Sequence, residues 1–399
     1  MDQMTTFAIC LILALILSEL CRKFNLPDVV GQITAGVILG LPALAGLWSK
    51  TVLIEHIEVL ADLGIVFLLL LAGLEINIKR LEKLSRIELL VAFFSAAIPF
   101  IIGFWVMTAL GYDLFVAIVV GSCLSITAEG TTLKVLMDMG QLNTKLGTII
   151  LGAGIIDDVI EVVLLALVLV FAQNPAAGIS GSGGDVLFFP LMVLAFMAIC
   201  IILFKITPKF MHKVQSHHSR INNFSMVMVL GIGIAAISQI FGLGPIIGAF
   251  FAGVLIHWVN QDKKEEVDIV EELKVMTFSF IIPFFFIYIG LHFDFKNLFD
   301  HTGMVILIVL IAIIGKLLGS FIVRYFTKKD ISIKQSFIIG WGMNSRGAIE
   351  LVIAEIARAN HLIPNFIYSA IVIMAVVTTL IFPLVLKHYL KVDPHIMNE

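Results

Sequence analysis

Charged residues are scarce in this chain, since only 14% of its 399 residues are Asp, Glu, Lys or Arg. Soluble domains carry about 25% charged and about 45–50% apolar residues, whereas 60% of this chain is apolar. The formal net charge of −3 provides no basic surface for nucleic acid. The four cysteines lie in apolar stretches, without the spacing of a metal site or a disulfide framework. These shortages exclude a water-soluble enzyme, a nucleic-acid-binding protein and a disordered scaffold.

Long apolar runs, in contrast, are abundant, and the mean hydropathy is +1.06. A membrane-spanning helix requires about 20 mostly apolar residues. Thirteen such runs are separated by polar breaks, which predicts an all-α polytopic membrane protein with about 13 transmembrane helices. The predicted spans are 5–21, 28–45, 57–77, 87–110, 113–136, 146–172, 186–207, 222–240, 244–260, 273–292, 302–326, 333–358 and 364–390.

The basic residues indicate the orientation of these spans. Of the 26 Lys and Arg residues, 21 lie in loops that follow odd-numbered spans or in the C-terminal tail. Loops on the other side hold 3, and the remaining 2, Lys316 and Arg346, lie inside predicted spans. Because cytoplasmic loops are enriched in Lys and Arg, we expect the N-terminus outside and the C-terminus in the cytoplasm.

The chain also repeats at an offset of 217 residues. Gly36 falls on Gly253, Gly73 on Gly290 and Gly130 on Gly347 at this offset, without a gap. The paired spans are seven crossings apart, so the two copies run in opposite directions, as in many secondary transporters. We therefore predict inverted six-helix repeats at 1–172 and 222–399, joined by a linker and one span at 173–221, with a substrate site near the membrane midplane.

Two adjacent carboxylates, Asp157 and Asp158, lie within the predicted span 146–172. Charges inside a span are costly, so they mark functional sites by default. Burial in an apolar medium favours the neutral form of a carboxylate, and the ionised form is a hard oxygen ligand for a cation. Such a group holds either a proton or a cation, which is the chemistry of a cation/proton exchanger. The alternative, that both residues cap a helix end or lie in a re-entrant loop, is disfavoured by the apolar residues on both sides.

Lys316 lies deep in the span 302–326, ten residues before Tyr325-Phe326. A buried ammonium needs a carboxylate partner, and either Asp157 or Asp158 is suitable. The alternative is a lysine that reaches the membrane interface along its aliphatic stem.

Small and polar residues interrupt the spans 113–136 and 333–358, which predicts two helices broken near the midplane. Glu129 in the first break maps onto Arg346 in the second, so the two side chains are candidates to neutralise each other. They are equally able to pair elsewhere, and Glu350 is another candidate for Arg346. Further candidate residues of this crossover region are Thr127, Asn344 and Ser345.

Together these residues resemble the cation/proton antiporter superfamily, in particular its electrogenic bacterial sodium/proton antiporters with an Asp-Asp motif. The resemblance covers essentially the whole chain. Its specific parts are the Asp157-Asp158 pair, Lys316, Leu26–Leu39, Pro283–Asp294 and Ser345-Arg346-Gly347. It implies a core domain, which holds two crossed broken helices and moves in an elevator-like manner against a dimerisation domain.

The resemblance also implies roles for individual residues. Asp158 is expected to bind the proton and Na+, and Asp157, a second candidate for Na+ binding, to form a salt bridge with Lys316. Two adjacent aspartates imply electrogenic exchange. The expected protein is a homodimer in the plasma membrane that uses no cofactor and exchanges Na+, with Li+ as a further substrate, for protons in pH homeostasis.

Two alternatives stay open. The first is K+/H+ exchange or K+ efflux in the same fold, because the sequence does not encode ion selectivity legibly. The second is an intramembrane aspartyl protease, which also uses two buried aspartates. Such a dyad brings its carboxylates together from separate helices, whereas Asp157 and Asp158 are consecutive and diverge.

Overall fold

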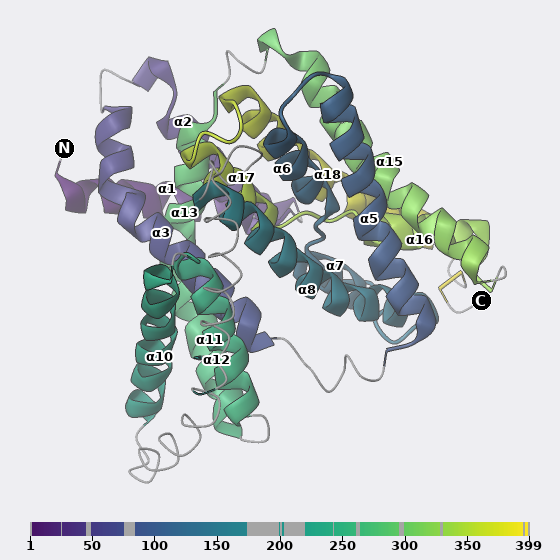
Figure 1. Ribbon diagram of the computed structural model, residues 1–399, viewed down its shortest axis with the longest axis horizontal. Helices are drawn as coiled ribbons and strands as arrows, with labels where there is room; N and C mark the ends of the chain where they lie inside the picture. The colour runs from purple at the N-terminus through teal and green to yellow at the C-terminus, as the bar shows by residue number, and fades with distance from the viewer. Residues whose placement is uncertain are drawn as a thin grey trace, which may run out of the picture. The chain divides into compact units, whose positions relative to one another are not determined.

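The computed structural model is helical throughout the residues it describes (Figure 1). These residues are 2–24, 26–44, 49–75, 84–173, 199, 202, 220–241, 243–260, 264–294, 299–327, 330–393 and 396–397. In chain order the helices are α1 (Gln3–Lys23), α2 (Asp28–Leu39), η1 (Pro42–Leu44), α3 (Lys50–Glu75), α5 (Arg86–Ala109), α6 (Leu114–Ser125), α7 (Glu129–Asp138), α8 (Lys145–Gln173), α10 (Arg220–Ile240), α11 (Pro245–Asn260), α12 (Lys264–Met276), the π-helical segment η3 (Thr277–Ile281), α13 (Ile282–His292), α15 (Thr302–Phe326), α16 (Ile333–Gly342), α17 (Ile349–Ala359) and α18 (Asn365–Val392).

The observed helices confirm the prediction of an all-α polytopic membrane protein. Within the described ranges, seven helical segments are long and apolar enough to cross a membrane, and three shorter helices are also apolar. The helix α3 begins at Lys50 rather than at 57, because its polar first turns continue the helix beyond the apolar run. The predicted span 186–207 and most of the predicted linker lie outside the described residues.

Contacts divide the chain into two compact units, and each unit takes helices from both halves of the sequence. Unit 1 comprises residues 1–17, 32–76 and 169–291, and unit 2 comprises residues 18–31, 77–168 and 292–399. Each unit thus combines segments of both predicted repeats. An inverted repeat makes such exchange natural, because equivalent helices of the two halves then pack together.

Unit 1 is held together by close glycine contacts between helices. The helices α3 and α11 meet at Gly73 and Gly253, where a Cβ on Gly73 would lie 3.0 Å from the Cα of Gly253. The helices α2 and α13 meet in the same way at Gly36 and Gly290, where a Cβ on Gly290 would lie 2.8 Å from the Cα of Gly36. The offset of 217 residues converts one contact into the other, since it maps Gly36 onto Gly253 and Gly73 onto Gly290. Small residues let membrane helices approach closely, so these positions fix the packing of the unit.

Unit 2 contains α5, α6, α7, most of α8, and α15 to α18. Capping boxes begin two of its helices, Ser85 with Glu88 at α5 and Ser332 with Gln335 at α16. The helix α15 packs closely on α5 (Figure 1). A Cβ on Gly315 of α15 would lie only 2.7 Å from the Cβ of Pro99, so this position must be glycine. Lys316, the next residue of α15, is fully buried in the unit.

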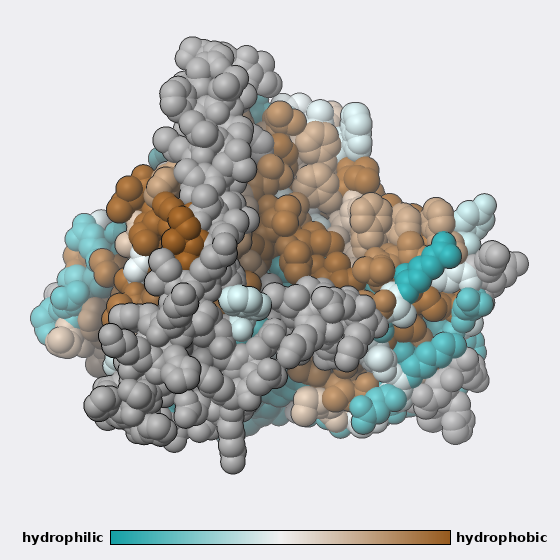
Figure 2. Space-filling model, turned by 60° about the horizontal axis from the view of Figure 1, so that its bottom comes forward, coloured by the Kyte–Doolittle hydropathy of each residue, from teal (hydrophilic) through white to brown (hydrophobic). Residues whose placement is uncertain are grey.

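The outer surface of the described helices is apolar, as the membrane assignment requires. Apolar side chains occupy a broad area of the face drawn in Figure 2. On α5 and α15 the exposed apolar side chains include Phe93, Trp105, Ile306 and Leu310. Water would make such exposure costly, whereas lipid tails accept it.

Candidate functional site

Two broken helices cross inside unit 2, as the sequence predicts. The backbone is non-helical at 126–128, between α6 and α7, and at 343–348, between α16 and α17. The two breaks are hydrogen-bonded to each other, because the Ala128 amide donates to the Ser345 carbonyl at 3.0 Å and the Ser345 hydroxyl donates to the Ala128 carbonyl at 2.8 Å. Ala128 and Ser345 are 217 residues apart, so the crossing joins equivalent positions of the two halves.

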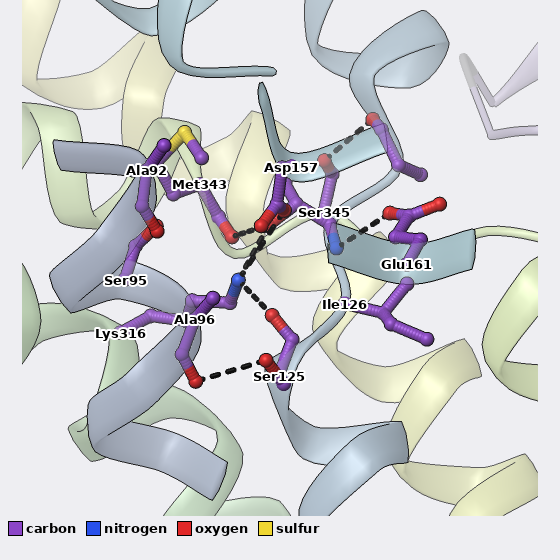
Figure 3. Close-up of polar contacts among 12 residues, drawn as sticks. Ala92, Ser95, Ala96, Ser125, Ile126, Asp157, Glu161, Lys316, Met343 and Ser345 are labelled. Carbon is purple, nitrogen blue, oxygen red and sulfur yellow. Dashed lines mark hydrogen bonds and ion pairs between the residues drawn. The ribbon is translucent and has the colours of Figure 1, made fainter. Parts of the chain in front are cut away.

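Two buried cations lie at the C-terminal end of α6. The Lys316 ammonium donates to the Ser125 carbonyl and, at 2.5 Å, to the Thr127 hydroxyl (Figure 3). The Arg346 guanidinium donates to the carbonyls of Cys123 (3.2 Å) and Ile126 through Nη1. A helix C-terminus carries a partial negative charge and unsatisfied carbonyls, so both cations are stabilised there.

Lys316 also forms an ion pair with Asp157 of α8. Its Nζ lies 3.7 Å from Asp157 Oδ2, and the side chains are 0% and 1% exposed (Figure 3). Neither carboxylate oxygen of Asp157 has a hydrogen-bond partner among the described residues. The ion pair is therefore the main compensation for this buried negative charge, and the structure brings together the two residues that the resemblance paired.

Two buried glutamates accept hydrogen bonds from backbone amides inside the two breaks. Glu161 of α8 accepts a hydrogen bond from the Thr127 amide at 3.1 Å, just before α7. Glu350 of α17 accepts one from the Gly347 amide at 2.6 Å. Both carboxylates thus satisfy amides near a helix N-terminus, where negative charge is favourable. No role for Glu161 followed from the sequence, although this residue lies one helical turn after Asp157 on the same face of α8.

Glu129 and Arg346 do not form the ion pair that their equivalent sequence positions allowed. Arg346 binds the carbonyls of α6, as described above, whereas the side chain of Glu129 lies against Gly154 of α8. A Cβ on Gly154 would lie 2.8 Å from both Cγ and Cδ of Glu129. Glu129 and Asp158 are both half-buried. The sequence did not single out Gly154, because glycine is common in membrane helices wherever two helices pack closely.

The remaining crossover candidates fix the two breaks. Thr127 donates to the Met343 carbonyl at 3.1 Å and also accepts the hydrogen bond from Lys316. Asn344 is fully buried and donates to the Ile313 carbonyl of α15 at 3.4 Å. Its side-chain oxygen has no hydrogen-bond partner in the described part of the chain. These hydrogen bonds connect the two breaks to each other and to α15.

Comparison with known proteins identifies the relatives of this chain. The profile of the family described as "Sodium/hydrogen exchanger, transmembrane" matches residues 8–392. The Na+/H+ antiporter of Enterococcus hirae is 31% identical over 389 residues, covering 96% of this chain and 97% of the relative. The Na+/H+-K+ antiporter GerN of Bacillus cereus is 28% identical over 381 residues, covering 96% of this chain and 94% of that protein. The structure of the sodium proton antiporter MjNhaP1 from Methanocaldococcus jannaschii has a TM-score of 0.67 at 17% identity, covering 98% of this chain and 96% of that one.

Proposed function

Because this chain belongs to the sodium/hydrogen exchanger family, we propose that it exchanges Na+ for protons across the membrane, with Asp158 binding the two ions in turn. The observation that carries this proposal is the buried ion pair between Lys316 and Asp157 at the crossing of the broken helices. The pair holds one of two adjacent aspartates beside a fixed cation. Its neighbour Asp158 points about 100° away around α8 and is half-buried, as an exchangeable site requires.

The charges around the crossing of the broken helices favour the binding of a proton or a monovalent cation there. Near the two breaks the carboxylates of Asp157, Glu161 and Glu350 are buried, and those of Asp158 and Glu129 are half-buried; the buried cations there are Lys316 and Arg346. If all these groups were ionised, negative charges would outnumber positive ones. Uncompensated charge inside a membrane is costly, so protons or monovalent cations are expected to bind. Competition between the two at Asp158 couples their transport.

We further propose that exchange is electrogenic and follows an elevator-like motion. The two aspartates favour electrogenicity, because a second proton can neutralise Asp157 when its ion pair with Lys316 opens. The division into two compact units is consistent with a core, unit 2, that carries Asp158 and moves relative to unit 1. The glycine contacts related by the offset of 217 residues support two inverted repeats as the basis of alternating access.

The cellular context is also part of this proposal. The bias of basic residues supports an external N-terminus and a cytoplasmic C-terminus in the plasma membrane. The resemblance to antiporters favours a homodimer, which light scattering of the detergent-solubilised protein would test. Potassium is the second candidate substrate, because GerN is described as an Na+/H+-K+ antiporter. A proteolytic dyad is disfavoured, since Lys316 already engages one of the aspartates.

The test uses purified protein in liposomes with an imposed pH gradient and a pH-sensitive dye in the lumen. Na+, Li+ and K+ are added in turn to the wild type and to Asp158→Asn. We expect Na+ and Li+ to collapse the gradient in the wild type only. Asp138→Asn is the matched control, because it removes an exposed carboxylate at the far end of α7. Wild-type exchange in Asp158→Asn would refute the assigned role, and changing the membrane potential tests electrogenicity.

A further inference from the structure

Glu161 is a buried acidic residue to which the proposed exchange assigns no role. It lies on α8, one helical turn after the two aspartates, and is only 3% exposed. One of its carboxylate oxygens accepts the hydrogen bond from the Thr127 amide (Figure 3). In the part of the chain that the structure describes, no cationic side chain forms an ion pair with it. If ionised, Glu161 would thus be a buried negative charge supported by a single amide.

The cations near Glu161 are engaged by other carboxylates. Lys316 forms its ion pair with Asp157, at 3.7 Å. The charge of Arg346 interacts more strongly with Glu350 than with Glu161. These are the two buried cations of the crossing, whereas three carboxylates are buried there. One buried carboxylate is therefore left without a cation, and the order of the interactions identifies it as that of Glu161.

Neighbouring charges on α8 further disfavour the ionised form of Glu161. Asp158 and Asp157 precede it by three and four residues, so both lie beside it on the helix surface. Their negative charges are the strongest repulsion that acts on Glu161, and Asp158 contributes the larger share. The described charged groups that act on Glu161 are Asp157, Asp158, Lys316, Arg346 and Glu350. A carboxyl group that is buried, lacks a cation and lies beside like charges is expected to bind a proton.

We propose that Glu161 is a second proton-binding site of the exchanger, which holds a proton while Asp158 is ionised and free of Na+, and releases it when Na+ binds to Asp158. The inference rests on the proposed exchange function and deepens it, because it places a transported proton on a residue other than the Na+ ligand. Na+ cancels the negative charge of Asp158, so the repulsion that retains the proton falls. The O–H bond of Glu161 then breaks, its electron pair stays on the carboxylate and the proton passes to water. Na+ binding therefore releases a proton even at a pH at which Asp158 has already lost its own.

Proton release on Na+ binding tests this proposal in the purified, detergent-solubilised protein. Na+ is added to wild type and Glu161→Gln in weakly buffered solution from acid to alkaline pH, and a pH-sensitive dye reports the protons released per protein. In acid, both proteins should release a similar number, because Asp158 supplies it. Toward alkaline pH, release by Glu161→Gln should fall about threefold or more below wild type, whereas Asp138→Asn, which removes an exposed carboxylate, should follow the wild type. Equal release by wild type and Glu161→Gln at every pH would refute the proposal.

Thermal stability also distinguishes a neutral Glu161 from an ionised one. Gln has nearly the shape of a protonated Glu, and its side-chain oxygen can still accept the hydrogen bond from the Thr127 amide. We therefore expect the unfolding midpoint of Glu161→Gln at neutral pH to stay within about 2 °C of wild type. Asp157→Asn is the contrasting variant, because it leaves Lys316 without its ion-pair partner and should lower the midpoint by several degrees. Equal losses in the two variants would show that Glu161 is ionised and compensated, against the proposal.

Infrared difference spectroscopy separates this proposal from the exchange function, because the C=O stretch of a protonated carboxyl group is visible whether or not transport occurs. Na+ should remove one such band from the wild type, and the band should be missing from Glu161→Gln. Glu355→Gln should keep it, since Glu355 is similarly buried but paired with Arg358. If the wild type exchanges no ions but shows this pattern, the proton site holds and the exchange function fails. If no band responds to Na+, or if the band persists in Glu161→Gln, the proton site is refuted even where exchange is observed.

Discussion

Replacing Lys316 by alanine tests the electrostatics of the crossing most directly. The variant loses an ion pair with Asp157 at 3.7 Å and two hydrogen bonds, to the Ser125 carbonyl and the Thr127 hydroxyl. Coulomb's law with an effective dielectric constant of 20 gives about 4.5 kcal/mol for the ion pair alone. Removing one partner of a buried pair typically costs about 3–5 kcal/mol, so the two values agree.

The expected result is a fall of roughly 6–10 °C in the unfolding midpoint of the detergent-solubilised protein, on the basis of about 2 °C per kcal/mol. The loss should be smaller in acid than at neutral pH, because a protonated Asp157 carries no charge that needs compensation. The double variant Lys316→Met with Asp157→Asn should recover most of the stability, since it removes both charges.

Lys334→Ala provides the matched control for this experiment. Lys334 pairs with Asp393 at 3.6 Å, nearly the same distance, but its side chain is 73% exposed. An exposed pair contributes about 0–1 kcal/mol, so this variant should change the midpoint by no more than about 2 °C. The reasoning fails if Lys334→Ala and Lys316→Ala destabilise equally, or if the double variant Lys316→Met with Asp157→Asn is no more stable than Lys316→Ala.

Three further predictions concern stability. Gly253→Ala should lower the free energy of unfolding by about 1–3 kcal/mol, because the added methyl group forces α11 away from α3. Gly233→Ala should leave it unchanged, because a Cβ there meets no atom within 4 Å; equal unfolding midpoints of the two variants would contradict this packing. Met397→Asp should lower the unfolding midpoint by several degrees, because Met397 is fully buried and its carbonyl accepts a hydrogen bond from the Leu146 amide at the start of α8. Asp393→Asn, the control, should leave the midpoint unchanged, and faster proteolysis of the C-terminal tail in Met397→Asp would show that the tail has detached. Arg346→Ala should destabilise unit 2 by about 2–4 kcal/mol through the uncapped carbonyls of α6, and hydrogen exchange there should increase.

The breaks in the two crossing helices could be predicted because they depend on local composition. Small and polar residues around Thr127 and Ser345 interrupt otherwise apolar runs, and helix interruption in a membrane requires such residues or neighbouring groups that satisfy the backbone. The groups that satisfy these breaks could not be predicted. Backbone carbonyls at the end of α6 bind Lys316 and Arg346, and a sequence does not show which carbonyls a distant side chain reaches.

The role of Gly154 illustrates the same limit. Its sequence position, four residues before Asp158, is compatible with ordinary helix packing. Only the structure shows that Glu129 of a different helix lies against it. Glu161 could have been included from helical periodicity, since it shares a face with Asp157, but its hydrogen bond from the Thr127 amide depends on how the break is oriented.

The sequence by itself determined the membrane class, most helical segments, the two interrupted spans and the buried charges Asp157, Lys316 and Arg346. These features follow from hydropathy, composition and helical period, which are local properties of the chain. The tertiary structure decided how those charges pair. Asp157 and Asp158 are adjacent in sequence but point about 100° apart, so the rotation of α8 against α15 determines which one meets Lys316. In the same way, the crossing of the broken helices brings Arg346 to the carbonyls of α6, more than 200 residues away in sequence, and the packing of α7 on α8 brings Glu129 to Gly154.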